Sequence, residues 1–189
     1  MAVIDFQEYK INKAIKDINN CTQEQIEELL ALLITNCSKA VPIVKISNKF
    51  GIKVYKKDLP SEVGAKLSIN KDLEKTHGSR IIVEVNQNLS RKMQRFAVAR
   101  ELSYYLFNVL PNVKVNEVTE VEDIYILNLK NDRYEKIATS ILMPEVAFCQ
   151  QFLIASEDYD WDYMERYLSS FFEVPRKIVN QKVKTLCNE

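Results

Sequence analysis

Residues 90–110 constrain the fold more than any other part of the chain. Apolar residues on this segment recur at helical spacing, and further apolar residues flank them. The positions that carry the spacing are Met93, Phe96, Ala99, Leu102, Leu106 and Leu110. Because a helix that is apolar on most of its surface belongs inside a protein, we expect a central, buried helix that Pro111 ends.

The residues before this segment predict helices followed by short strands. Residues 22–25 match a capping box ahead of an apolar helical run at 26–34, and Pro42 and Gly51 bound a further short helix. Three strand candidates follow, separated by turn-rich segments. We expect them to form an antiparallel meander of residues 52–55, 65–69 and 80–85.

The residues after Pro111 predict mostly helices. Residues 123–129, DIYILNL, alternate like a strand but also fit an irregular excursion. Helical spacing returns at 132–143 and ends at Pro144, and a pair of helices is expected at 160–172 and 175–186. The elements together predict a mostly helical α+β fold.

Composition excludes several classes of protein. Lysine plus arginine and aspartate plus glutamate each number 26 in 189 residues, so no global positive charge drives binding to phosphates. The sequence has neither a membrane-spanning apolar run nor a recognisable signal peptide, so we expect a cytoplasmic protein. Four widely spaced cysteines are typical of reduced thiols. They are Cys21, Cys37, Cys149 and Cys187.

Residues 100–104, Arg-Glu-Leu-Ser-Tyr, have the spacing of a zinc-hydrolase helix without its metal ligands. In an HExxH helix, two histidines one turn apart hold the metal, and the glutamate acts as the base for the metal-bound water. Here Glu101 stands at the base position, whereas Arg100 and Tyr104 stand at the ligand positions. A cationic guanidinium would repel a metal ion. Taken alone, a Glu-Leu pair on an apolar helix is most often a chance occurrence.

The order of segments around this motif resembles the ImmA/IrrE family of bacterial and phage metallopeptidases. Residues 41–60, VPIVKISNKFGIKVYKKDLP, resemble the family's short helix and first strand. Residues 79–108, SRIIVEVNQNLSRKMQRFAVARELSYYLFN, resemble its strand and its R-F-x-x-A-H-E-L-G-H-x-L helix. YEKIATSILMP at 134–144 and MERYLSSFFEVPRKIVNQKVKTL at 164–186 resemble its later helices.

The resemblance implies a zincin-like α+β domain with a small three-stranded antiparallel sheet and a C-terminal helical pair. It divides the chain into N-terminal helices at 1–40, a peptidase-like domain at 41–150 and a C-terminal helical hairpin at 151–189. The family's third zinc ligand is acidic. An ungapped alignment puts Arg133 at that position, and Glu135 takes it if the register differs.

The substitutions predict a degenerate active site that has no zinc. Its residues would be Arg100, Glu101, Tyr104, Arg133 and Glu135. A buried Glu101 carboxylate needs a cation. We expect Arg133 on the facing helix to supply it, and we expect Arg100 to stack on Tyr104 one turn along.

Active members of the family resemble switches that cleave a helix-turn-helix repressor. The resemblance therefore implies an inactive, regulatory protein-binding module in a bacterial, phage or mobile-element setting, with such a repressor as the kind of partner. The alternative is an active metallopeptidase with atypical ligands, such as Glu101, Glu135 and another carboxylate around a different metal. Purely structural use of the fold stays open as well.

Other features have plainer interpretations. The C-terminal segment resembles a helix-turn-helix with Arg176, Lys177, Lys182 and Lys184 near its second helix, but its apolar spacing favours a packed helix over direct nucleic-acid binding. The single histidine, His77, is expected to be structural or exposed. The acidic runs at 116–123 and 156–162 are interpreted as solvated loop charge.

Overall fold

The computed structural model describes Ile11, Ile15, Ile18 and residues 21–35, 40–112, 120–128, 133–158 and 160–187. Cys37 and part of the acidic run at 116–123 lie outside the described residues. The helix α2 (Gln23–Thr35) begins at the predicted capping box. The Thr22 N–H donates to Gln25 Oε1 at 2.8 Å, and the Gln25 N–H donates to Thr22 Oγ1 at 3.3 Å.

The sheet has four strands and is mixed, so the expected three-stranded antiparallel meander was wrong. The strands are β1 (Ile52–Lys57), β2 (Val63–Asn70), β3 (Ile81–Asn86) and β4 (Glu120–Ile126), in the order β1-β3-β2-β4. β3 pairs in parallel with β1 and antiparallel with β2, and β2 pairs antiparallel with β4. The alternating segment at 123–129 thus supplies part of an edge strand. Strand order depends on long-range pairing, which side-chain alternation does not specify.

The predicted central helix is present but changes its winding. Its first part is α5 (Arg91–Tyr104), which begins where the Ser90 side chain accepts from the Met93 N–H at 3.3 Å. The π-helical segment η2 (Tyr105–Val109) continues it, and α6 (Leu110–Asn112) extends one residue beyond Pro111. The winding therefore widens directly after residues 100–104.

Shorter helices complete the fold. α3 (Ile43–Lys49) precedes β1, and α4 (Leu73–His77) connects β2 to β3. After β4 come α7 (Arg133–Leu142), α8 (Glu145–Asp158), α9 (Trp161–Phe171) and α10 (Arg176–Cys187). The last two are the predicted C-terminal pair, whereas α8 is additional to the predicted helices. No single described helix has the length and apolar composition of a membrane span, although α7 and α8 pass as a pair bent by 67°.

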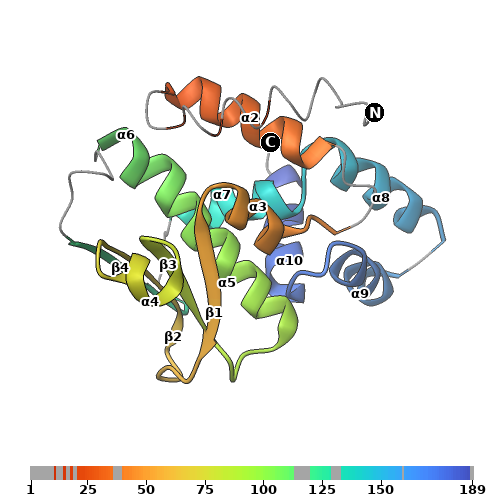
Figure 1. The fold of residues 1–189 in the computed structure, drawn as a ribbon. Helices are drawn as coiled ribbons and strands as arrows, with labels where there is room; N and C mark the ends of the chain where they lie inside the picture. The colour runs from red at the N-terminus through yellow and green to blue at the C-terminus, as the bar shows by residue number, and fades with distance from the viewer. Residues whose placement is uncertain are drawn as a thin grey trace, which may run out of the picture.

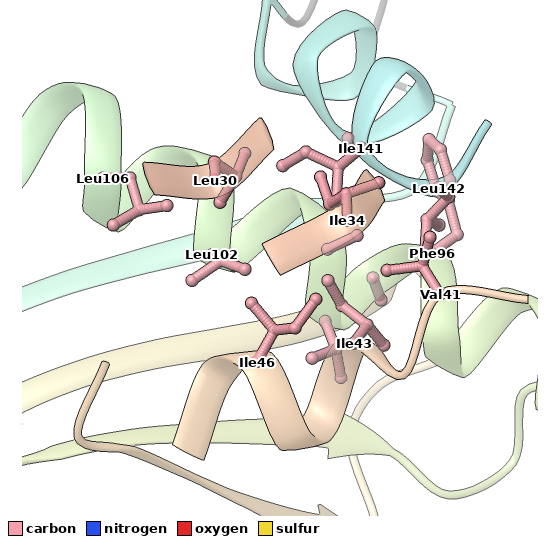
Figure 2. Close-up of a cluster of buried hydrophobic side chains, with 14 of the residues drawn as sticks. Leu30, Ile34, Val41, Ile43, Ile46, Phe96, Leu102, Leu106, Ile141 and Leu142 are labelled. Atoms are coloured by element: carbon pink, nitrogen blue, oxygen red, sulfur yellow. The ribbon is translucent and has the colours of Figure 1, made fainter. Parts of the chain in front are cut away.

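α5 runs through the middle of the molecule, between the sheet and the later helices (Figure 1). One face of it packs on β2 and β3, and another packs on α7. Figure 2 shows the core that forms where α2, α3, α5 and α7 meet. Its labelled side chains are Leu30, Ile34, Val41, Ile43, Ile46, Phe96, Leu102, Leu106, Ile141 and Leu142. Residues 100–104 are therefore held on a helix that packing restrains on several sides.

Candidate functional site

Arg100 on α5 is buried in a cluster of acidic and aromatic side chains. Its side chain is 7% exposed, and its Nη1 donates to Glu101 Oε1 at 3.3 Å and to Asp123 Oδ2 on β4. The guanidinium carbon lies 5.5 Å from the ring centre of Tyr104 and 5.3 Å from those of Tyr125 and Tyr134. Three aromatic faces and two carboxylates thus surround one cation, which offsets the cost of removing that cation from water.

Glu101 is fully buried beside this cation. Burial raises the pKa of its carboxyl well above the usual range, and the nearby Asp123 carboxylate raises it further, whereas Arg100 opposes the shift. Its Oε2 has no hydrogen-bond partner among the residues that the structure describes. Asp123 is the second carboxylate that accepts from Arg100, so the guanidinium contacts two acidic side chains.

Two tyrosines connect the cluster to α7. The Tyr125 hydroxyl donates to Glu135 Oε1 at 2.5 Å. The ring of Tyr134 packs edge-on against Tyr104 with centroids 5.1 Å apart, and the exposed Arg133 lies on the same ring with its guanidinium carbon 5.1 Å from the centroid. Tyr134 and Glu135 on α7 therefore contact the cluster, Tyr134 through the ring of Tyr104 and Glu135 through the hydroxyl of Tyr125.

The structure gathers the five predicted residues around one cluster but changes their pairing. The expected stacking of Arg100 on Tyr104 is present. The expected pairing of Glu101 with Arg133 was wrong, because Arg100 itself donates to Glu101 while Arg133 lies on the outer side of Tyr134. The physical reason is that the guanidinium of Arg100 reaches back to its neighbour Glu101 and across to β4, which sequence spacing along a helix does not predict.

Residues from β4 complete the cluster, and sequence reasoning missed them. Asp123 and Tyr125 lie in the segment whose strand character was left open, and they alternate by two, so both side chains are on the same face of the strand. Tyr134 lies on the helix predicted at 132–143 but was not among the predicted site residues. The one signal available was this alternation of Asp123 and Tyr125 in a segment that also fitted an excursion.

Gly64 brings the ring of Tyr125 close to β2. The ladder between β2 and β4 shifts register between Val63 and Ala65, which leaves Gly64 as the extra residue of a bulge. A Cβ atom at this glycine would lie 2.5 Å from Tyr125 Cδ1 and 2.9 Å from Leu127 Cδ2. The Tyr125 ring therefore occupies the space that a side chain at position 64 would need.

Arg100 and Tyr104 do not provide the ligands of a zinc site. Zinc is held by imidazole, thiolate or carboxylate groups, and a guanidinium is none of these. Across the described ranges, no group of three or more His, Cys, Asp or Glu side chains could hold a metal ion. His77 lies on α4, where its ring packs against Tyr55 with centroids 5.0 Å apart.

Comparison with known proteins gives one family match. The model of the Peptidase M78 family, described as IrrE N-terminal-like domain, matches residues 47–184. Among solved structures, a Mycobacterium tuberculosis transcriptional regulator is similar at a TM-score of 0.49 and 13% sequence identity. That match covers 93% of this chain and 51% of the regulator, so the chain spans about half of that protein's length. No curated protein matches the sequence.

Proposed function

The chain belongs to the Peptidase M78 family, the IrrE N-terminal-like domain, and from this premise we propose that it is a non-catalytic member. In this proposal, it acts as a regulatory module that binds a protein partner beside the former active site. The observation that carries the proposal is the position of Arg100, whose buried guanidinium pairs with Glu101 and Asp123 where the HExxH motif has its first histidine.

The cluster has the charge distribution of a structural site. In a zinc hydrolase, the cation polarises a water molecule that the glutamate deprotonates. A guanidinium has no vacant coordination position for water, so Glu101 has no metal-bound water beside it to deprotonate. In this proposal, the Arg100 guanidinium therefore links α5 to β4 and does not activate a substrate.

A groove beside the cluster supports binding of a partner helix. It has a volume of about 530 Å³ and lies between α2 and α7, with Arg133 on its wall. Its apolar lining residues are Leu30, Ala31, Ile34, Phe107, Ile137, Ile141 and Pro144. Grooves between two helices commonly accept a third, amphipathic helix. A helix-turn-helix repressor, the partner class expected from the sequence, consists of such helices.

Metal content and peptidase activity test the loss of catalysis. We expect protein purified without a chelator to contain well below one zinc per chain and to leave peptide substrates intact. The matched positive control is Arg100→His with Tyr104→His, made with and without Arg133→Glu, because restored ligands should raise zinc affinity. About one zinc per wild-type chain, removed by a chelator together with stability, would overturn the proposal in favour of a peptidase with atypical ligands.

Partner binding is tested with purified repressors encoded beside the gene. Ala31→Arg puts a charge into the groove and should abolish the interaction in a pull-down, because burying that charge in the complex is costly. Leu153→Arg is the matched control, because Leu153 is 63% exposed on α8, and it should leave binding unchanged. Equal loss in both variants, or binding that survives Ala31→Arg, would contradict a partner site in this groove.

A further inference from the structure

A second groove lies on the other side of α7, between it and α10. Its volume is about 460 Å³, and all of its lining residues are polar or charged. Its lining residues are Glu135, Lys136, Thr139, Ser140, Gln181, Lys182, Lys184 and Thr185. Three lysines and one glutamate therefore face one concave space.

The three lysines have no counter-ion in the described part of the chain. None of the ammonium groups of Lys136, Lys182 and Lys184 makes a hydrogen bond or ion pair there. Lys182 is half-buried, and its Nζ lies 5.3 Å from the ring centre of Phe148. Burial lowers the pKa of Lys182, with the nearby Glu145 acting in the opposite direction. A bound anion would give these three ammonium groups a counter-charge.

The lining has one acidic residue, Glu135, against three lysines, so its side chains carry net positive charge. The Glu135 carboxylate accepts the Tyr125 hydroxyl at 2.5 Å, so it is held toward the buried cluster. The hydroxyls of Thr139, Ser140 and Thr185 donate to backbone carbonyls of their own helices. The lysines and the Gln181 amide are therefore the donors that remain for a ligand.

The other cations of α10 differ, because they are paired. Arg176 donates to Glu165 Oε2 at 2.8 Å and also binds Asp162, and Lys177 donates to Asn128 Oδ1 at 2.7 Å. Among the described residues of α10, the lysines without a hydrogen-bond partner are thus those in the groove, Lys182 and Lys184. A protein that binds along a nucleic-acid backbone needs a continuous positively charged surface.

We propose that the groove between α7 and α10 binds a small phosphorylated molecule through Lys136, Lys182 and Lys184. Compact ligand sites typically have volumes of about 300–1,000 Å³, and this groove falls in that range. A phosphate chain provides several acceptor oxygens and multiple negative charges, which matches three ammonium donors in one space. The site shares Lys136 and Ser140 with the partner groove, and its Glu135 accepts a hydrogen bond from Tyr125 of the Arg100 cluster.

Calorimetric titration with inorganic tripolyphosphate and, separately, with ATP tests the proposal. At about 0.15 M salt, we expect saturable binding of one molecule per chain by at least one of the two probes. If ATP binds more tightly than tripolyphosphate, the groove also contacts the nucleoside. If the two bind equally, the groove recognises the phosphates alone. Lys136→Gln with Lys184→Gln should weaken binding by about 10-fold or more, since each lost ion pair contributes about a kcal/mol.

The matched control removes two exposed lysines from the sheet. Lys53→Gln with Lys56→Gln on β1 makes the same change in net charge and should alter affinity by less than about twofold. If the double variant loses its helical circular dichroism signal, the single variant Lys184→Gln replaces it in the test. Absence of saturable binding, or equal weakening by the control, would overturn the site. Tighter binding of a DNA duplex of about 20 base pairs with the same lysine dependence would assign the groove to nucleic acid and overturn the small-molecule proposal.

Discussion

Arg100 carries a charge that burial makes costly unless the surrounding groups satisfy it. Its side chain is 7% exposed, and those of Glu101 and Asp123 are 0% and 19% exposed. Isolated charges in such surroundings cost several kcal/mol each, whereas a paired guanidinium also gains from aromatic faces. At the scale of single residues, the cluster is therefore stable only while all of its members are present.

Arg100→Met should be strongly destabilising. It leaves the Asp123 carboxylate buried without its cation, so we expect the free energy of unfolding in urea to fall by about 3–5 kcal/mol. Asp123→Asn in the same chain should recover part of that loss, because it removes the unpaired charge. The coupling energy from the double-mutant cycle should exceed about 0.5 kcal/mol.

Arg133→Met is the matched control for that cycle. Arg133 is exposed on α7 and lies over the outer side of Tyr134, so its loss should change the free energy of unfolding by less than about 0.5 kcal/mol. An effect of Arg133→Met as large as that of Arg100→Met would show that the cation of the cluster has been misassigned.

At the scale of elements, the site depends on how β4 meets β2 and α5. β4 is an edge strand, and its side chains Asp123 and Tyr125 reach the helix, while the bulge at Gly64 makes room for the tyrosine ring. The π-helical segment that follows α5 lets the chain gain a residue within a turn, and such segments often occur at functional sites. Small changes in these elements would therefore shift the side chains that contact Arg100.

Gly64→Ala should destabilise the protein by about 1–3 kcal/mol, because the added Cβ collides with a ring that is itself fully buried. Urea unfolding measures the loss. Tyr125→Leu in the same chain removes the ring atoms, so the two changes should cost less together than the sum of each alone.

Gly78→Ala provides the comparison. A Cβ at Gly78 meets nothing within 4 Å, and only its φ of 66° is strained. Its cost should be about 1 kcal/mol and independent of Tyr125. Strict additivity of Gly64→Ala and Tyr125→Leu would mean that the glycine does not make room for the ring.

At the scale of the whole molecule, Arg95 joins three distant parts of the chain. From α5, its Nη2 donates to the Val41 carbonyl at 2.8 Å, and its Nε donates to the Glu173 carbonyl at 3.2 Å. Glu173 has a φ of 51° in the turn between α9 and α10. The C-terminal helices are thus tied to the central helix and to the entry into α3, which favours unfolding as one unit.

Arg95→Met should cost about 2–4 kcal/mol, since two backbone carbonyls lose a charged donor. In the wild type, circular dichroism and the fluorescence of Trp161 on α9 should report the same urea midpoint. Arg91→Met is the control, because the Arg91 side chain is 84% exposed and its Nη2 lies 3.8 Å from Oε2 of the same Glu173. A fluorescence midpoint well below that of circular dichroism in the wild type would show that the C-terminal hairpin unfolds separately.

Local patterns in the sequence determined much of this protein's secondary structure. The capping box at Thr22 and the closing helix pair appear as predicted, and the central helix is present, although it turns π-helical at Tyr105 and continues past Pro111. The reason is that capping and side-chain period involve residues only a few positions apart. The order of motifs likewise sufficed to indicate the family, which the match over residues 47–184 shows.

Only the tertiary structure decided the strand order and the partners of the buried charges. β3 lies between β1 and β2, and Asp123, 23 residues from Arg100, supplies the carboxylate that this cation binds. Strand pairing and charge pairing depend on which distant segments meet, and many arrangements are compatible with the same local pattern. For this reason sequence spacing favoured Arg133 as the partner of Glu101, whereas packing brought Arg100 and β4 together.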